Sequence, residues 1–574
     1  MSLTGGQPMR RWLATALRLS AAAALAAVLL LVLVLPSLGF ILSMPALPAL
    51  PRDWQPPTRL ESDQGAWASD GSAQLRRVGG VWWLDAAGSP EALGAAQGLL
   101  LHPLIMDLEG DLVDTLRERV PTVLARHLLL GLVGLNNSRL PQFFQPRELR
   151  EIRAATAVAP PTSDPWRAMG HPYQRALHYH ALHDVSQYLI DNPLVRPIQV
   201  GCTAFAIGGP HSASGGLLIG RLFDFEGGPR FDNDKVVFTL RPDQGHAFMH
   251  VAWPGLTGAV TGMNERGIWV SINAAATSAQ RLVGRPIIMA VREILQYASS
   301  IAEAEEILRR SPVFVSNGVL VASRDEQRAV LFEIGPSGLA QREAVDQRLI
   351  NTNHFEHPAW AEDARNQQRL AEGTTTVRAA RVLELLDGKL QQEPLSAADL
   401  AVILRDRRGL GDRDVGFHNR STINAWIAAH LVIADLEAGL MWVAEPRHGL
   451  GTLRAFSIDG PLPEADLPAD PELPLLRQHL ARFQFLRDAL SRNRLPAAQI
   501  PAAVAELLAL NPQSFEAHWL AGRAAQAADN QATATYHLQR ALELQPAYPA
   551  DERAIRRSLN GEPAPGPGDP PADP

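Results

Sequence analysis

Short apolar runs separated by glycine- and proline-rich turns fill the middle of the chain, from residue 202 to residue 275. This alternation is typical of β-strands joined by tight turns. The pattern predicts strands at 203–207, 217–225, 236–240, 247–253, 258–263 and 268–273. It returns further along the chain and predicts strands at 318–323, 329–334 and 349–352, with a closing hairpin of 429–434 and 440–444.

Helical spacing of apolar residues interrupts these strands. Apolar residues, mostly leucines, recur every three or four positions between residues 91 and 130, where Pro103 is expected to divide the stretch into two helices. A strand at 78–84 precedes them, and further helices are predicted at 288–308, 376–386 and 396–404. Strands and helices in such blocks predict an α+β fold in which two packed sheets carry helices on their outer faces.

An apolar segment lies near the N-terminus. Between Leu19 and Met44 the only polar side chains are three serines, and the segment is long enough to cross a bilayer. Three arginines precede it, at positions 10, 11 and 18, which predicts that the N-terminus stays inside. We expect a single-pass anchor in a bacterial inner membrane, with the rest of the chain exported to the periplasm. A cleaved signal peptide is the alternative.

The C-terminal part of the chain has a different pattern. Five prolines between residues 459 and 474 predict a domain boundary, and Leu476, Leu480 and Phe483 then begin a helical stripe. Residues 511–546 resemble one tetratricopeptide unit, which could form a groove for a protein partner or a cap on the neighbouring domain. The expected organisation is a membrane segment (1–44), a linker (45–75), the N-terminal part of the main domain (76–201), the body of that domain (202–458), a linker (459–474), a helical region (475–558) and a disordered tail (559–574).

The composition and the absence of some common motifs limit the classes of function that the chain can have. The chain is 46% apolar and 20% charged with a net charge of −7, which fits a globular protein without a basic surface for nucleic acid. It has no Walker loop, no H-E-x-x-H and no dinucleotide fingerprint, so we expect no cofactor. The histidines at 178, 180 and 183, with Asp184, lack the usual zinc-binding helical pair and are expected to be structural, so no metal site is predicted.

Cys202 is the only cysteine of the chain, and it follows Gly201 directly. The glycine lets the preceding peptide adopt the strained geometry in which a thiol can attack its own carbonyl. Arg221 would favour the thiolate, and Asp224 could hold a freed α-amino group. Because positions three apart in a strand point to opposite faces, both can reach the thiol only at a bulge or a strand end.

Three motifs in order carry a resemblance to a known family. Gly201-Cys202-Thr203, then Gly220-Arg221 with Asp224-Phe225, then Thr352-Asn353-His354-Phe355 resemble the isopenicillin N acyltransferase (acyl-CoA:6-aminopenicillanic acid acyltransferase) family of N-terminal-nucleophile hydrolases. Choloylglycine hydrolases and acid ceramidase are more distant relatives with similar sites. The chain departs from the family in its membrane segment, its helical C-terminal region and a looser spacing from Cys202 to Asp224.

The resemblance implies an αββα sandwich and autocatalytic cleavage between Gly201 and Cys202. The new α-amino group would act as general base, and the thiolate would form a thioester with the acyl group of an amide. Asn353 would donate a hydrogen bond to the oxyanion, and Asn351 is an alternative because both lie two apart in one segment. Two further residues resemble polar positions of the wider superfamily: Asn273 and Arg420.

The sequence thus predicts a self-processing amidase or acyltransferase that acts on a small amide, an N-acyl compound or a short peptide. The alternative from another functional class is a catalytically silent, membrane-anchored interaction protein that uses its C-terminal helices. A third possibility is a cysteine peptidase with a separate histidine base, for which the candidates are His211, His354 and His418.

Overall fold

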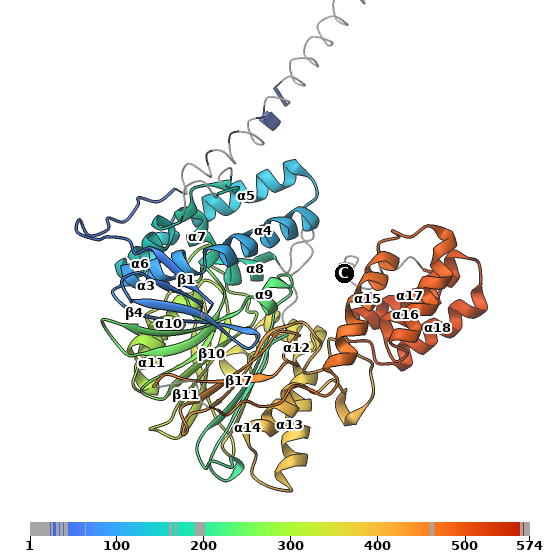
Figure 1. Cartoon of the computed structure of the whole chain (residues 1–574). Helices are drawn as coiled ribbons and strands as arrows, with labels where there is room; N and C mark the ends of the chain where they lie inside the picture. The colour runs from blue at the N-terminus through green and yellow to red at the C-terminus, as the bar shows by residue number, and fades with distance from the viewer. Residues whose placement is uncertain are drawn as a thin grey trace, which may run out of the picture.

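A computed structural model of the chain describes residues 23–24, 27–29, 34, 38, 44–63, 65–159, 164–166, 169–189, 201–459, 464–562 and 566 (Figure 1). Most of the predicted membrane segment and most of the predicted tail therefore lie outside the described residues. Among the residues that are described, no helix is both long enough and apolar enough to span a bilayer.

Two β-sheets form the centre of the molecule (Figure 1). The larger has eleven strands in the order β1 (Arg59–Ser62), β2 (Gly65–Ala68), β3 (Ala73–Val78), β4 (Val81–Gly88), β7 (Val236–Pro242), β8 (Phe248–Ala252), β9 (Thr261–Asn264), β10 (Ile268–Ala274), β11 (Asn317–Ser323), β12 (Arg328–Gly335) and β13 (Gly338–Glu343). The smaller has six, in the order β14 (Arg348–Asn351), β5 (Thr203–Ile207), β6 (Leu218–Asp224), β15 (Ala428–Asp435), β16 (Leu440–Ala444) and β17 (Leu453–Ser457). β4 and β7 are parallel, and the other neighbouring strands of the two sheets pair antiparallel.

The sheets pack face to face between two layers of helices. Apolar side chains of both sheets, such as Val237 of β7 and Val432 of β15, form one core between them. A second core joins the outer face of the larger sheet to α3 (Pro90–Leu100), α4 (His102–Arg119), α6 (Pro146–Ala157), α7 (Pro172–His180), α10 (Ile287–Tyr297) and α11 (Ile301–Arg309). A third joins the smaller sheet to α13 (Thr375–Leu390) and α14 (Ala397–Leu404). The prediction of an α+β fold is confirmed, and the helices lie on the outside.

The N-terminal half differs from the prediction in two places. Residues 45–75 were expected to be a linker, but β1, β2 and the first part of β3 fall within them. β1, at the edge of the sheet, has no buried residue, and β2 and β3 are only partly buried, so pairing with neighbours decides their conformation more than local hydrophobicity does. The stretch 91–130 holds parts of three helices, α3, α4 and α5 (Val123–Asn137), instead of two. Pro103 lies in the first turn of α4, where its missing N–H costs nothing.

The apolar stretch 288–308 is also divided, into α10 and α11. Ser300 caps the second helix, because its side chain accepts a hydrogen bond from the backbone N–H of Glu303. The remaining short helices of this part are α8 (Leu182–Leu189), α9 (Arg230–Asn233) and α12 (Ala364–Glu372). In the smaller sheet β17 adds a third strand to the predicted closing hairpin.

A helical bundle follows the sheets (Figure 1). It consists of α15 (Leu473–Ser491), α16 (Ile500–Leu510), α17 (Phe515–Ala527), α18 (Gln531–Glu543) and α19 (Pro549–Leu559). Buried Phe515, Trp519, Leu538 and Ile555 form a core shared by α17, α18 and α19. The predicted C-terminal helical region is therefore present, whereas its tetratricopeptide character stays a prediction.

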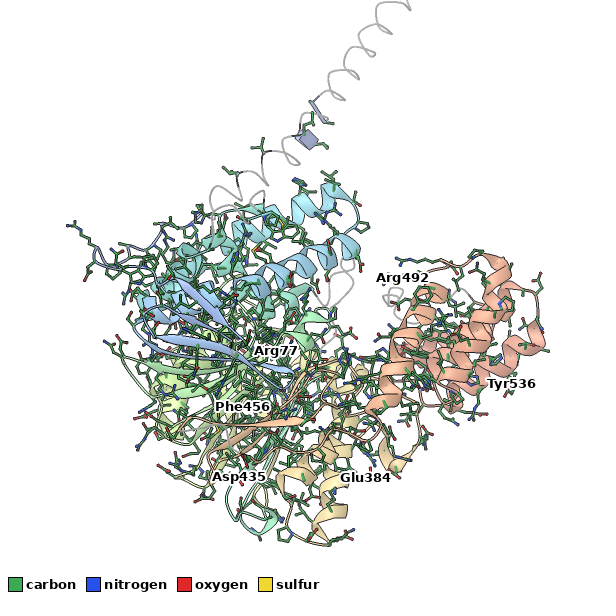
Figure 2. All side chains as sticks on the ribbon, in the orientation of Figure 1. Arg77, Glu384, Asp435, Phe456, Arg492 and Tyr536 are labelled. Atoms are coloured by element: carbon green, nitrogen blue, oxygen red, sulfur yellow. The ribbon has the colours of Figure 1, made fainter. Side chains whose placement is uncertain are left out.

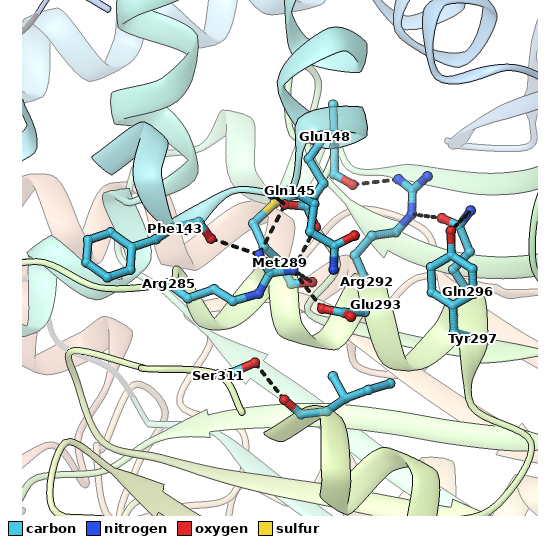
Figure 3. Close-up of polar contacts among 12 residues, drawn as sticks. Phe143, Gln145, Glu148, Arg285, Met289, Arg292, Glu293, Gln296, Tyr297 and Ser311 are labelled. Carbon is cyan, nitrogen blue, oxygen red and sulfur yellow. Dashed lines mark hydrogen bonds and ion pairs between the residues drawn. The ribbon is translucent and has the colours of Figure 1, made fainter. Parts of the chain in front are cut away.

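Buried ion pairs tie the segment before Cys202 to the segment after it. Arg285 donates to the Glu148 carboxylate of α6 at 2.7 Å and to Glu293 of α10 at 2.9 Å (Figure 3). Arg292 of α10 contacts Glu151 of α6 at 3.3 Å. Since β1 to β4 also belong to the larger sheet, cleavage before Cys202 would leave the two fragments held together.

Replacement of Arg285 by alanine should lower the free energy of unfolding by about 3–5 kcal/mol, because Glu148 would stay buried without its cation. The side chains of Arg285 and Glu148 are only 6% and 4% exposed. Urea unfolding measures the loss. The exposed pair of Arg309 and Glu305 provides the control, since Arg309→Ala should cost less than about 1 kcal/mol. Equal losses in the two variants would contradict the prediction.

Candidate active site

Cys202 immediately precedes β5 in the smaller sheet, and its side chain is 1% exposed. β5 pairs with β6 so that Thr203 lies opposite Leu222 and Ala204 opposite Arg221. This register brings the two residues before β5 next to the end of β6. The Cys202 thiol lies 3.7 Å from the carbonyl oxygen of Asp224.

The end of β6 also explains how Arg221 and Asp224 can serve one site. Asp224 is the last residue of the strand, and β15 shifts its register between Ala428 and His430, opposite Asp224 and Phe223. The predicted requirement for a bulge or a strand end is thus met by the strand end, and the irregularity lies in the neighbouring strand β15. The Asp224 carboxyl turns toward Gly201, where an added Cβ would stand 2.9 Å from its Oδ2. A side chain at position 201 would therefore displace the carboxyl.

Asp224 is a buried carboxyl group surrounded by charges. Burial raises the pKa of Asp224 to about 7, against the opposing effect of the guanidinium groups of Arg420 and Arg378. Its Oδ1 atom has no hydrogen-bond partner among the described residues. A buried carboxyl that faces Gly201 and has one oxygen without a partner is suited to accept from an α-amino group at Cys202.

Arg221 is a fixed cation beside the thiol. It is fully buried, and its Nη1 donates to the Asn273 side chain at 2.5 Å and to the Leu222 carbonyl at 3.0 Å. Burial lowers the pKa of Arg221, whereas its hydrogen bond with Cys202 and the charge of Asp224 act in the opposite direction. Asn273 in turn donates to the carbonyl of Asn351 at 2.6 Å. Asn273 therefore orients Arg221 and joins the two sheets at the site.

Arg378 is the site residue that the sequence analysis missed. From the first turn of α13, its Nη1 donates to the Gly201 carbonyl at 2.7 Å, to the Cys202 carbonyl at 2.6 Å and to the Thr203 hydroxyl at 2.9 Å. Its Nη2 donates to Asn353 Oδ1 at 2.7 Å. The guanidinium thus binds the carbonyl of the bond that the thiol would attack. A sequence signal existed, because Arg378 shares a helical stripe with the apolar Val382 and Leu386.

The two asparagine alternatives are separated by their contacts. β14 ends at Asn351, whose Nδ2 donates to the Gly318 carbonyl of β11 at 3.2 Å. Asn353 lies beyond the strand and contacts Arg378, and its Nδ2 donates to the Ala274 carbonyl at 2.9 Å. Each amide nitrogen makes one of its two possible donations, but only Asn353 contacts Arg378, which binds the Gly201 carbonyl. The geometry therefore favours Asn353.

Arg420, the remaining candidate of the sequence analysis, binds a near neighbour of Asp224. It donates to Glu226 Oε1 at 3.0 Å, two residues beyond Asp224, and its side chain is 9% exposed. Among the contacts of the described residues, Arg378 and not Arg420 holds the carbonyls of Gly201 and Cys202. Arg420 acts on the site through its charge on Asp224.

The three candidate histidine bases have other partners. His211 faces Asp346 at 3.2 Å, His354 lies between Thr375 and Glu356, and His418 contacts Arg487. Within the described part of the chain, none of the three has a hydrogen bond with the thiol. The described contacts therefore give no support to the alternative of a cysteine peptidase that uses one of these histidines as its base.

Comparisons with known proteins place this geometry in context. Protein dcd1B of Dictyostelium discoideum is 24% identical over 267 residues, and the chain spans about half the length of that protein (49%, with 43% of this chain aligned). Among solved structures, the Caenorhabditis elegans ortholog of N-acylethanolamine-hydrolyzing acid amidase is 14% identical and has a TM-score of 0.30. The alignment covers 41% of this chain and 93% of that one. Penicillin V acylase from Agrobacterium tumefaciens is 13% identical over 42% of this chain and 83% of that one, with a TM-score of 0.29.

One segment of the chain matches the model of a protein family, and that segment holds the part of the site that follows Cys202. It includes Arg221, Asp224, Asn273, Asn353 and Arg378, and it leaves out Cys202 and Arg420. Residues 212–414 of the chain match the model of the family described as acyl-coenzyme A:6-aminopenicillanic acid acyl-transferase.

Proposed function

We propose that the chain is a self-processing cysteine amidase or acyltransferase of the N-terminal-nucleophile type. The observation that carries the proposal is the position of the Gly201 carbonyl, which is bound by Arg378 next to the only thiol of the chain. Arg221, Asp224 and Asn353 complete a connected and buried polar set around it. Burying so many charged groups is costly, so their convergence favours an enzyme over a silent interaction protein.

The first reaction would be cleavage of the chain itself. The Cys202 thiol attacks the carbonyl carbon of Gly201, and negative charge develops on the oxygen that Arg378 binds. The peptide C–N bond breaks as its nitrogen takes up a proton, and the acyl group passes to sulfur as a thioester. Water then hydrolyses the thioester, which leaves a carboxylate at Gly201 and a free α-amino group at Cys202.

The second reaction would be turnover of a substrate amide. The α-amino group takes the thiol proton as the thiolate attacks the amide carbonyl, and it then gives that proton to the leaving amine. The acyl-enzyme is released by water in a hydrolase or by an amine in an acyltransferase. A small molecule or short peptide with an amide or N-acyl group is the proposed substrate. The membrane anchor and exported location predicted from residues 1–44 stay part of the proposal and rest on that sequence alone.

Intact-mass measurement and N-terminal sequencing of the purified chain test this function. We expect two fragments, the larger beginning at Cys202 and ending at Pro574, because the folded site positions the thiol for attack. The Cys202→Ala variant should stay uncut, since it lacks the nucleophile. A single uncut chain for the unmodified protein under native conditions would contradict the proposal.

A further inference from the structure

The C-terminal helical bundle holds a loop that leads into the active site. The loop comprises residues 416–426, between α14 and β15. Asn511 binds Phe417 twice, because its Nδ2 donates to the Phe417 carbonyl at 2.8 Å and its Oδ1 accepts from the Phe417 N–H at 3.3 Å. The Phe417 ring packs against Phe483 of α15 at 5.1 Å between ring centres, and against Trp426 of its own loop at 4.7 Å.

The next two residues of the loop also bind the bundle. His418 Nε2 lies 2.6 Å from Nη1 of Arg487 on α15, and its Nδ1 lies 3.0 Å from the carbonyl of Ala425, across the loop. Asn419 donates to the backbone carbonyl of Gln545, between α18 and α19, at 3.2 Å. Three successive residues of the loop thus bind parts of the bundle that lie more than fifty positions further along the sequence.

The residue after these three is Arg420, which points into the protein. Its guanidinium lies between Glu226, to which it donates at 3.0 Å, and the hydroxyl of Tyr548, a hydrogen-bond partner at the start of α19. Although burial lowers it, the pKa of Arg420 is raised overall, because Glu226 and Tyr548 both favour the charged guanidinium. The bundle therefore both holds the loop and contacts the arginine that the loop presents.

We propose that the helical bundle is part of the catalytic unit, and that Tyr548 is a positioning residue that holds Arg420 beside Asp224. The bundle acts in this proposal as a cap that completes the site, rather than as a groove for another protein. The inference rests on the proposed function in one respect, namely that Asp224 serves the α-amino group of Cys202.

The consequence concerns the charge on Asp224. The charged groups that face Asp224 are Arg420, Arg378, Glu226 and Arg221. The groups that face Arg420 are Glu226, Tyr548, Asp224 and Arg378, with Glu516 and His418 nearby. Arg420 is the foremost of the cations that oppose the effect of burial on Asp224. If Arg420 moves away, the pKa of Asp224 rises further, and the carboxylate forms only at higher pH.

Direct titration of Asp224 tests the inference without any need for turnover. The full chain carrying Cys202→Ala is labelled with carboxyl-¹³C aspartate, and the Asp224 signal is assigned by its loss in Asp224→Asn. We expect Arg420→Gln to raise the midpoint by about one pH unit or more, and Tyr548→Phe to raise it by less. Tyr536→Phe is the matched control, because Tyr536 lies on α18 of the same bundle and is 61% exposed (Figure 2).

Combined substitutions separate positioning from a general loss of structure. If Tyr548 acts through Arg420, the double variant Tyr548→Phe with Arg420→Gln should titrate like Arg420→Gln alone. Arg420→Lys, which keeps the charge and loses the planar fork, should give an intermediate midpoint. An unchanged midpoint in Tyr548→Phe, or shifts that add in the double variant, would overturn the inference. Failure of the unmodified chain to cleave would instead count against the proposed function. The titration would still decide whether Tyr548 positions Arg420.

Discussion

Replacement of Arg378 by glutamine is expected to slow cleavage between Gly201 and Cys202 at least about 100-fold. Arg378 donates to the Gly201 carbonyl at 2.7 Å, so it is in place before negative charge develops on that oxygen. Removal of a preorganised donor typically costs about two to three orders of magnitude in rate, since a mobile solvent dipole replaces a fixed cation. The measurement is the fraction of cut chain against time after refolding, read by mass.

Two further variants identify what Arg378 contributes. Arg378→Lys keeps the positive charge but cannot bind the Gly201 carbonyl and Asn353 together, so we expect a rate between those of the unmodified chain and Arg378→Gln. Arg381→Gln is the matched control, because Arg381 lies one turn further along α13, is equally buried and binds Asp406 instead of the site. It should lose stability yet still cleave at the unmodified rate. Equal slowing by Arg378→Gln and Arg381→Gln would show that stability, and not the carbonyl contact, sets the rate.

The strands that follow Cys202 could be predicted well from the sequence because each carries its own signals. β5 and β16 are buried along almost their whole length and are bounded by turn residues, and their bounds agree with the predicted ones. β13 was missed because it is a polar edge strand, with only partly buried or exposed residues. Its conformation comes from pairing with β12, which is a property of the sheet and not of the segment.

The residues of the site likewise fall into those that the sequence could single out and those that it could not. Gly201, Cys202, Arg221, Asp224 and Asn353 lie in short local motifs, so the sequence could single them out, and the structure brings them together. Arg378 has no such motif around it. Its contact with the Gly201 carbonyl depends on α13 packing against the smaller sheet, and single-sequence patterns do not report how a helix docks. The place of Arg420 likewise depends on Tyr548, more than one hundred residues away.

The largest pH effect on stability is expected from Asp184, which lies in α8 shortly before the proposed cleavage site. Asp184 is fully buried, its Oδ1 accepts from the backbone N–H of Ile287 at 3.4 Å, and its Oδ2 has no partner among the described residues. Burial raises the pKa of Asp184 from 3.8 to about 8. Between these values the folded chain keeps a proton that the unfolded chain has released. The contribution of Asp184 to the free energy of unfolding therefore falls as the pH rises from about 4 to about 8.

Asp184→Asn removes this loss, because an amide does not ionise. We expect the variant to gain at least ~2 kcal/mol over the unmodified chain between pH 5 and pH 8.5, since each unit of pKa difference is worth about 1.4 kcal/mol. Urea unfolding of both chains at the two pH values measures the gain. Any effect of the amide that does not depend on pH cancels when the stability difference between the two chains at pH 5 is compared with that at pH 8.5. The titration of Asp224 also cancels, because both chains retain Asp224. Asp325→Asn, at a side chain that is 51% exposed, controls for the chemical change itself. A stability difference that is the same at both pH values would mean that Asp184 is already charged in the folded chain at pH 5, and that α8 is solvated where the structure buries it.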